Sequence, residues 1–515
     1  MANICSGQFD QKQPNILFIM SDDHSANAVS CYGSLLASVF RTPNIDRIAR
    51  EGTRLNHFYC TNAICTPARA TLMTGQYSHV NGVRTLIDSW DGRQGPNLAK
   101  ILQQEGYTTA MFGKWHLHSA PWGFDACKFL SAAGGQGTYQ NPEFMEMKSD
   151  GSFSLHQHPG YVTDIITEMC VSWLREERER EKPFFLMCHH KAPHDFWEYA
   201  PRHEDLFQGK DIPVPDSLFE NKSHRSAATR EYGSSVTPRS KVRSLYAHFC
   251  KPSYVTGPLT GTENMTFEEK GHAAYQKYLK DYLRTVAAID ESVGTLLDEL
   301  EMQGILDETL IIYTSDQGMF LGEHDYQDKR WSFEESLRSP FAVRYPPAIP
   351  AGGIGDLLMA NVDLAPTLLD YAGVQIPKEM QGISCRKIFE CSAESPVRQE
   401  VYYRYWMHLA NGHNNPSHFG IRTDRWKLTF YYGLPLDAQG AIQQESPAGW
   451  ELYDMGNDPM ELKNLYGLKE YAEIVSNLKQ RLDQVRQEVG DTDEKYPDIG
   501  QRMNMDVIHE GDVLH

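Results

Sequence analysis

The 515-residue sequence lacks several features that would place it in a simple class of protein. None of its ten cysteines forms a CxxC pair, which disfavours a zinc ribbon or a thioredoxin-like site. No apolar run reaches the roughly 20 residues that a transmembrane helix needs. The N-terminus lacks the basic and apolar regions of a signal peptide. We therefore expect a cytoplasmic chain as written, or a periplasmic or secreted one whose export signal has been removed.

Basic residues are also in deficit, because 49 Lys and Arg face 68 Asp and Glu, a net charge of -19. This balance disfavours nucleic acid and an anionic membrane surface as partners. An anionic substrate would need a local cationic pocket inside an acidic protein. The apolar fraction of 41% and the charged fraction of 23% are ordinary for a globular protein. The length predicts two or three structural units.

Short apolar runs separated by helical patterns are present along the first three quarters of the chain. The runs at 15–20, 107–112, 184–188 and 309–314 predict buried strands. Apolar residues at intervals of three and four predict a long helix over 274–302. Strands that alternate with helices predict an α/β fold, a mostly parallel sheet flanked by helices.

The texture of the sequence changes near residue 391. We predict a catalytic α/β domain over 1–390, with an insertion at about 202–264 where the periodicity fades. Strand-like segments joined by short turns and a helix over 471–489 predict a smaller α+β subdomain over 391–515. The sequence does not indicate the oligomeric state.

The stretch 64–80 places a cysteine just ahead of a helix that Pro67 can start and Gly75 can end. Cys65 would lie at the positive end of this helix, where free N–H groups favour an anion. Taken alone, one cysteine at a helix start is as readily a small buried apolar residue.

Polar side chains follow each of the predicted strands. They are Asp22 and Asp23, then Lys114 and His116, then His194, then Asp316 and Gln317. Because ligands of open α/β sheets bind beyond the carboxyl ends of the strands, we expect these groups to meet. Two adjacent carboxylates leaving a buried strand repel each other unless a cation or another partner neutralises them. Taken singly, the two aspartates could instead belong to a solvated turn and Gln317 to a turn at a helix start. Each lone Lys or His could be a surface charge or a polar group satisfied within the fold.

The run from Cys65 to Arg69, CTPAR, followed by a Thr-Gly pair, resembles the activation signature of type I sulfatases. Ala68 stands where that family usually has Ser. The segment 322–340, GEHDYQDKRWSFEESLRSP, resembles the second signature of the family. The resemblance implies an alkaline-phosphatase-like fold, one divalent cation, usually calcium, and a formylglycine that a maturation enzyme makes from the cysteine.

The same resemblance implies the metal ligands. They would be Asp22, Asp23, Asp316, Gln317 and the modified Cys65. Gln317 departs from the family, which usually has Asn or His there. This set of hard oxygen donors suits calcium, since it contains no cage of imidazoles or thiolates.

The resemblance also implies the residues that act on the substrate. The catalytic set would be Cys65, Arg69, Lys114, His116, His194 and Lys329. Arg69 lies one helical turn after Cys65 and would steady it. Lys114 and Lys329 would contact sulfate oxygens, and the two histidines would serve as general base and general acid. Glu334, Glu335 and Arg338 are better interpreted as structural pairs than as catalysts.

The aromatic and polar run from 402 to 418 suits a sugar ring, so we predict substrate contacts from His408 and His418. The resemblance adds Lys114, His194 and Lys329 as substrate contacts. An ordinary packed strand and its loop explain His408 and His418 equally well. The reading we favour is a sulfatase acting on a sulfated saccharide of glycosaminoglycan or mucin type, similar to N-acetylglucosamine-6-sulfatases. A phosphonate or phosphate ester hydrolase of the same superfamily and a non-catalytic sugar-binding relative remain the alternatives.

Overall fold

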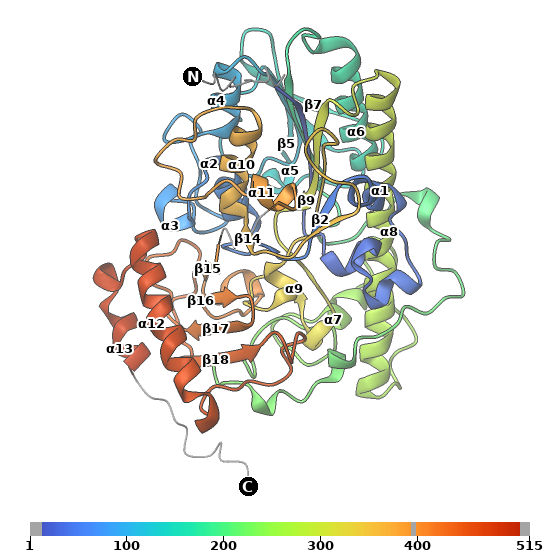
Figure 1. Cartoon of the computed structure of the whole chain (residues 1–515). Helices are drawn as coiled ribbons and strands as arrows, with labels where there is room; N and C mark the ends of the chain where they lie inside the picture. The colour runs from blue at the N-terminus through green and yellow to red at the C-terminus, as the bar shows by residue number, and fades with distance from the viewer. Residues whose placement is uncertain (1–12, 393–397, 505–515) are drawn as a thin grey trace, which may run out of the picture.

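The computed structural model describes residues 13–392 and 398–504. A ten-stranded sheet runs through the larger part of the molecule, and a separate four-stranded sheet lies beside it (Figure 1). The strand order in the large sheet is β13-β2-β12-β9-β1-β8-β4-β5-β6-β7, where β13 is Gly353–Gly355 and β2 is Thr53–Leu55. Among the described residues, no helix combines the length and hydropathy that crossing a bilayer requires.

The middle of the large sheet is parallel. Its strands are β9 (Thr309–Ser315), β1 (Asn15–Ser21), β8 (Phe184–His189), β4 (Thr108–Gly113) and β5 (Ala126–Leu130). All of them except β5 are buried on both faces, and continuous apolar runs fit such a position because neither face of the strand meets water. The flanking strands β12 (Phe341–Arg344), β6 (Glu143–Met147) and β7 (Phe153–Gln157) pair in antiparallel fashion. The predicted mostly parallel α/β sheet is thus confirmed.

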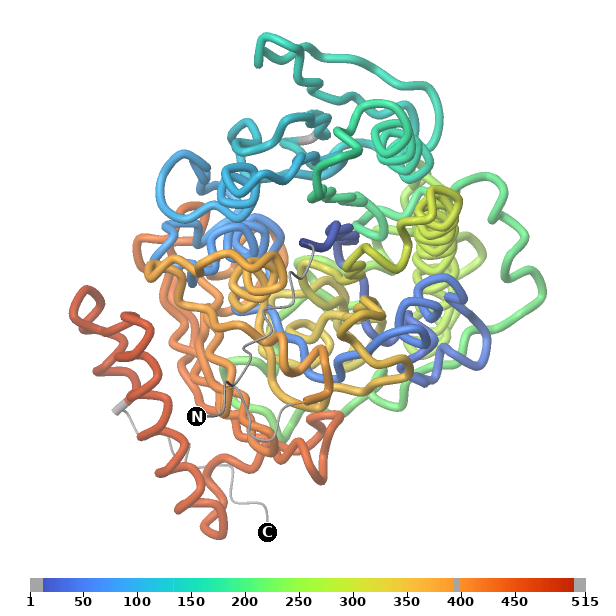
Figure 2. Tube along the Cα trace, turned by 45° about the horizontal axis from the view of Figure 1, so that its top comes forward, coloured from blue at the N-terminus to red at the C-terminus, as the bar shows by residue number. Residues whose placement is uncertain are grey.

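Helices cover both faces of this sheet. One face packs against α2 (Cys65–Thr74), α4 (Leu98–Gln104) and α10 (Leu364–Tyr371). The opposite face packs against α1 (Pro43–Glu51), α6 (Val162–Ser172) and α8 (Phe267–Met302). Alternate residues of β1 supply the two cores: Phe18 faces the first group of helices and Ile19 faces the second. Figure 2 shows the dark-blue N-terminal strand in the middle of the fold.

The long helix starts earlier than its apolar stripe predicts. α8 begins at Phe267 rather than near 274, because Thr266 and Glu269 form a reciprocal capping box. The first turn is exposed and polar, so periodicity could not reveal it. The segment predicted as an insertion holds 3-10 turns and α7 (Leu245–Phe249), and it packs along α8.

The small sheet consists of β15 (Glu400–Tyr405), β16 (His418–Thr423), β17 (Trp426–Tyr431) and β18 (Gly449–Asp454), all antiparallel. The first three match the strand-like segments of the sequence, which lie at 401–406, 419–423 and 426–432, whereas β18 was not predicted. α12 (Ala472–Val489) packs along the outside of this sheet (Figure 2). The apolar core between sheet and helix also takes in Tyr59 and Tyr77 of the larger unit. The division at residue 390 stays a prediction.

Candidate active site

The carboxyl end of β1 places Asp22 and Asp23 side by side, and both are buried. Asp23 has a left-handed φ of 66°, which turns its carboxylate back toward Asp22 instead of to the opposite face. The Lys114 ammonium pairs with Asp22 Oδ2, and Lys329 Nζ lies 2.5 Å from Asp23 Oδ2. Burial alone would raise the pKa of Asp22, but Lys114 and neighbouring cations hold it well below its usual value.

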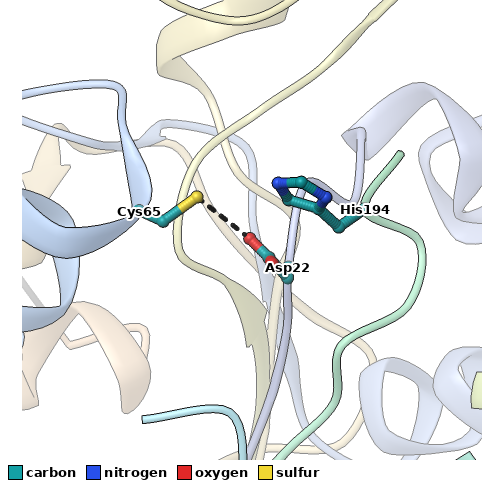
Figure 3. Close-up of side chains that lie close together, drawn as sticks. All are labelled: Asp22, Cys65 and His194. Atoms are coloured by element: carbon teal, nitrogen blue, oxygen red, sulfur yellow. Dashed lines mark hydrogen bonds between the residues drawn. The ribbon is translucent and has the colours of Figure 1, made fainter. Parts of the chain in front are cut away.

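Helix α2 begins at Cys65 and directs the thiol toward this pair. Cys65 Sγ lies 3.3 Å from Asp22 Oδ1 (Figure 3). Burial and the Asp22 carboxylate raise the pKa of the thiol far above its usual value, so the helix start does not produce a thiolate. One turn later, Arg69 Nε donates to Asp316 Oδ2 at 3.0 Å, and its Nη1 donates to the Lys114 carbonyl. Arg69 therefore ties α2 to the ends of two strands.

The end of β9 supplies Asp316 and Gln317. Asp316 Oδ1 accepts from the backbone N–H of Asp23 at 3.2 Å, and Gln317 Nε2 donates to Asp23 Oδ1 at 2.5 Å. Burial and the nearby Asp22 raise the pKa of Asp316 to about 7. Among the described residues, Gln317 Oε1 has no hydrogen-bond partner. Three carboxylates thus converge, and Gln317 contacts one of them through Nε2 while its amide oxygen stays available.

A divalent cation fits this arrangement. One oxygen each of Asp22, Asp23 and Asp316 lies within 4.8 Å of the others, all three residues are buried, and the donors are hard oxygens. A bound cation would relieve the repulsion that raises the pKa of Asp316. The predicted ligands therefore lie together, and their chemistry suits calcium better than zinc.

Strand β4 ends in Gly113, and the next residues supply Lys114 and His116. The Lys114 ammonium also contacts Gln136 Oε1, whose amide nitrogen lies 3.4 Å from His116 Nε2. His116 has a φ of 57° and, within the part of the chain described, no partner for Nδ1. Backbone strain of this kind gathers at functional sites, where the surroundings hold it in place. The segment after β4 thus brings both Lys114 and His116 to the site, as predicted.

His194 approaches from the loop after β8. Its Nε2 lies 3.8 Å from Asp23 Oδ2, and it belongs with Asp22 and Cys65 to a second group of atoms within 4.8 Å (Figure 3). Figure 3 shows the thiol and the imidazole on opposite sides of the Asp22 carboxylate. The structure therefore gathers one cysteine, five cationic or imidazole side chains and three carboxylates from six separate segments.

Comparison with known proteins assigns the family. The model of the sulfatase family matches residues 14–374. The chain belongs to the sulfatase family. A second model, the C-terminal part of N-sulphoglucosamine sulphohydrolase, matches residues 322–488 of this sulfatase. The resemblance predicted from the two signatures is confirmed, and the protein is a hydrolase of sulfate esters.

Individual relatives extend the likeness over nearly the whole sulfatase. An N-acetylglucosamine-6-O-sulfatase of Bacteroides thetaiotaomicron is 40% identical, covering 94% of this chain and 88% of that relative. A solved structure described as a complex with its substrate D-glucosamine-2-N,6-O-disulfate is 39% identical, with a TM-score of 0.82, over 94% of this chain and all of that one. A phosphonate monoester hydrolase of Agrobacterium radiobacter, 22% identical with a TM-score of 0.68 over 92% of this chain and 96% of that one, shares the fold.

Two predicted substrate contacts of this sulfatase have other partners in the structure. His408 Nε2 contacts the Gln444 carbonyl at 2.8 Å, and its Nδ1 accepts from the Ser417 N–H. The His418 ring stacks on Tyr405, and its Nδ1 contacts the Pro416 carbonyl at 2.9 Å. Both side chains are buried, and among the described residues neither contacts the carboxylate cluster. Their contact with a sugar therefore stays a prediction, and packing is the other role that these partners suit.

Other polar residues at the site escaped the sequence analysis of this sulfatase. Asp328 and Arg330 flank Lys329, each with a left-handed φ, and Arg330 Nε donates to Asp328 Oδ2 at 2.7 Å. His413, from the same loop as His408, lies 3.1 Å from that carboxylate oxygen. Because Asp328 and Arg330 are the neighbours of Lys329 in the sequence, they could have been predicted to lie near the site. His413 lies within the run 402–418 that the sequence analysis connects with a sugar, but no pattern singled it out, because its approach to Asp328 depends on how the two sheets pack.

Proposed function

We propose that this sulfatase hydrolyses a sulfate ester of a glycosaminoglycan-type amino sugar, with 6-sulfated N-acetylglucosamine as its candidate substrate. It would act through a formylglycine made from Cys65 and a calcium ion held by Asp22, Asp23, Asp316 and Gln317. The observation that carries the proposal is the convergence of three buried carboxylates with Cys65, Arg69, Lys114 and Lys329. The substrates named for the relatives at 40% and 39% identity support the choice of sugar.

The cationic side chains have separate roles in binding an anionic ester. Lys114 and Lys329 come from different segments and each contacts one of the two aspartates, so a sulfate bound beside them meets two positive charges. Although burial alone would lower it, the pKa of Lys329 lies well above its usual value because of Asp23, so this ammonium stays charged. Arg69 is occupied by Asp316 and by the Lys114 backbone, which suits it to fix the geometry.

The two histidines are suited to proton transfer. His116 lies near Lys114. Burial, and to a smaller extent the charge of Lys114, lower the pKa of His116 well below 6.5, so the imidazole is neutral and can accept a proton. His194 faces the site through Nε2 and can protonate the sugar oxygen as it leaves. A formylglycine supplies a hydrated aldehyde oxygen as nucleophile, which the buried, protonated thiol of Cys65 does not.

The proposal is tested with protein produced together with a maturation enzyme and supplied with calcium. Mass spectrometry of the peptide that spans Cys65 should find formylglycine, and defined sulfated monosaccharides should be turned over, 6-sulfated N-acetylglucosamine fastest. An unmodified thiol in active protein would refute the nucleophile. A large preference for a phosphate or phosphonate monoester over the matching sulfate ester would favour the alternative hydrolase.

A further inference from the structure

The imidazole of His194 is held from behind by the next residue. His194 Nδ1 lies 2.9 Å from Asp195 Oδ1 and 2.8 Å from the Asp195 carbonyl oxygen. Both of these atoms are acceptors, so Nδ1 carries the proton and Nε2, which faces Asp23 at 3.8 Å, is left to exchange one. The ring orientation and tautomer therefore depend on where the Asp195 carboxylate lies.

Asp195 is itself held by an arginine from the segment predicted as an insertion. Arg243 Nη2 donates to Asp195 Oδ2 at 2.8 Å, and its guanidinium lies over the Phe196 ring at 5.6 Å. Burial alone would raise the pKa of Asp195, but His194 and Arg243 hold it well below the usual value, so the acceptor remains a carboxylate. One oxygen of Asp195 thus serves the histidine and the other serves the arginine.

The backbone around Arg243 is fixed. Its carbonyl accepts from the Ser235 N–H at 3.0 Å, and its own N–H donates to Ser240 Oγ at 3.3 Å. Ser235 also forms a bridge to Tyr326, in the loop that carries Lys329. Arg243 therefore lies in a structured segment that is anchored to the loop of Lys329. Such support holds a side chain in place before the substrate binds.

We propose that Arg243 is a positioning residue of this sulfatase: acting through Asp195, it orients His194 so that Nε2 protonates the departing sugar oxygen. The inference rests on the proposed function, because it needs His194 to serve the leaving group. It gives the inserted segment a task in catalysis although none of its described side chains is among the catalytic or metal-binding residues proposed above.

The test compares Arg243→Ala, Arg243→Lys and Asp195→Asn with the parent, as full-length, mature, calcium-loaded enzyme on 6-sulfated N-acetylglucosamine. We expect kcat to fall about 10- to 30-fold in Arg243→Ala and about 100-fold in Asp195→Asn, with KM within about threefold, since general acid catalysis supplies about 10²–10⁴. Arg243→Lys should recover part of the loss, and so should millimolar guanidinium ion added to Arg243→Ala.

Arg202→Ala is the matched control. Arg202 also bridges two acids, Asp164 and Glu291, but it does so on the surface and away from His194. A loss of kcat that equals the loss in Arg202→Ala, or that follows the fall in melting temperature across the variants, would overturn the positioning role. Parental kcat in Arg243→Ala would overturn it as well. A parent without turnover on sulfated sugars would instead refute the proposed function, and this inference with it.

Discussion

The two sheets of this sulfatase use the same kinds of polar residue in different ways. At the carboxyl edge of the large sheet, Asp22, Lys114 and Asp316 follow the ends of parallel strands and point toward one another. In the small sheet, His418 and Lys427 lie within strands and pair with neighbouring groups of the fold. Both sets are buried, so burial alone does not separate a reactive site from a packed one.

The difference lies in how the charged groups are arranged. At the edge of the large sheet, one oxygen each of Asp22, Asp23 and Asp316 lies within 4.8 Å of the others, a spacing that a cation fits. In the small sheet, Lys427 Nζ already lies 2.8 Å from Glu334 Oε1 and 2.9 Å from Glu461 Oε1, so a lysine occupies the position between the two carboxylates. The first set should therefore govern turnover, and the second should govern stability.

The largest effect is expected at Cys65. Cys65→Ala should reduce turnover of the sulfated sugar by more than about 10⁴-fold, because it removes the nucleophile. The melting temperature should change little, since a small side chain at the start of α2 is replaced by a smaller one. Steady-state kinetics and thermal unfolding measure the two quantities on the same preparation.

Cys127→Ala, a buried cysteine of β5 in the core of the large sheet, is the control. It should keep turnover within about twofold and lower the free energy of unfolding by about 1 kcal/mol. Substantial activity in Cys65→Ala would contradict both the nucleophile and the distinction between edge and interior.

Removal of the cation comes next. Dialysis against a calcium chelator should abolish most turnover and lower the melting temperature, and calcium should restore both. A ligand present at 100 times its dissociation constant stabilises the folded state by about 2.7 kcal/mol. The carboxylates of Asp22, Asp23 and Asp316 are left to repel each other without the ion. Full activity after exhaustive chelation, checked by elemental analysis, would show that the cluster needs no metal.

Sequence reasoning located most of this edge because strand ends are a strong signal. Apolar runs identified β1, β4, β8 and β9, and polar residues just beyond them were predicted to meet, as Asp22 and Asp316 do. The family signatures then supplied chemical roles. The same reasoning predicted sugar contacts from His408 and His418, because a histidine among aromatic residues looks alike in a binding loop and in a packed sheet.

The remainder depended on tertiary structure. Asp195 follows His194 directly, but only the turn of the chain brings its carboxylate back to the imidazole. Arg243 lies about 50 residues further along in a segment without periodicity, so no local pattern links it to the site. β18 was missed because its alternation is short, and pairing with β17 stabilises it more than its own propensity does.

A substitution inside the small sheet should act on stability instead. Lys427 is fully buried on β17, and Lys427→Met keeps its length while leaving Glu334 and Glu461 without their shared cation. Loss of one member of a buried ion pair costs about 3–5 kcal/mol. Chemical denaturation should show that loss, with kcat per folded molecule changed far less than in Cys65→Ala.

Lys495→Met is the matched control for that measurement. Lys495 pairs with Asp437 at 2.6 Å, but it is 66% exposed, and surface pairs contribute about 0–1 kcal/mol. Equal effects of the two substitutions would mean that the buried ion pairs do not hold the small sheet against the larger unit.

The smallest effect concerns acid stability. Burial lowers the pKa of His418 from 6.5 to about 4, and burial does the same for His408. Between these values the unfolded chain binds a proton that the folded chain does not, so stability present above pH 6.5 is lost as the pH falls toward 4. One such histidine lowers the free energy of unfolding by up to about 3 kcal/mol at pH 4.

His418→Phe tests this effect and, with it, whether His418 packs within the sheet or contacts the sugar. At pH 8 the variant should lose about 1 kcal/mol, because the contact of Nδ1 with the Pro416 carbonyl disappears, and its kcat/KM should stay within about threefold. Its melting temperature should then fall less steeply than that of the parent between pH 6.5 and 4. His156→Phe, on the exposed end of β7, controls for the substitution itself. A loss of kcat/KM of tenfold or more at pH 8, without a matching loss of stability, would assign His418 to the substrate site. It would also mean that residues within strands of the small sheet, and not only those at strand ends, take part in turnover.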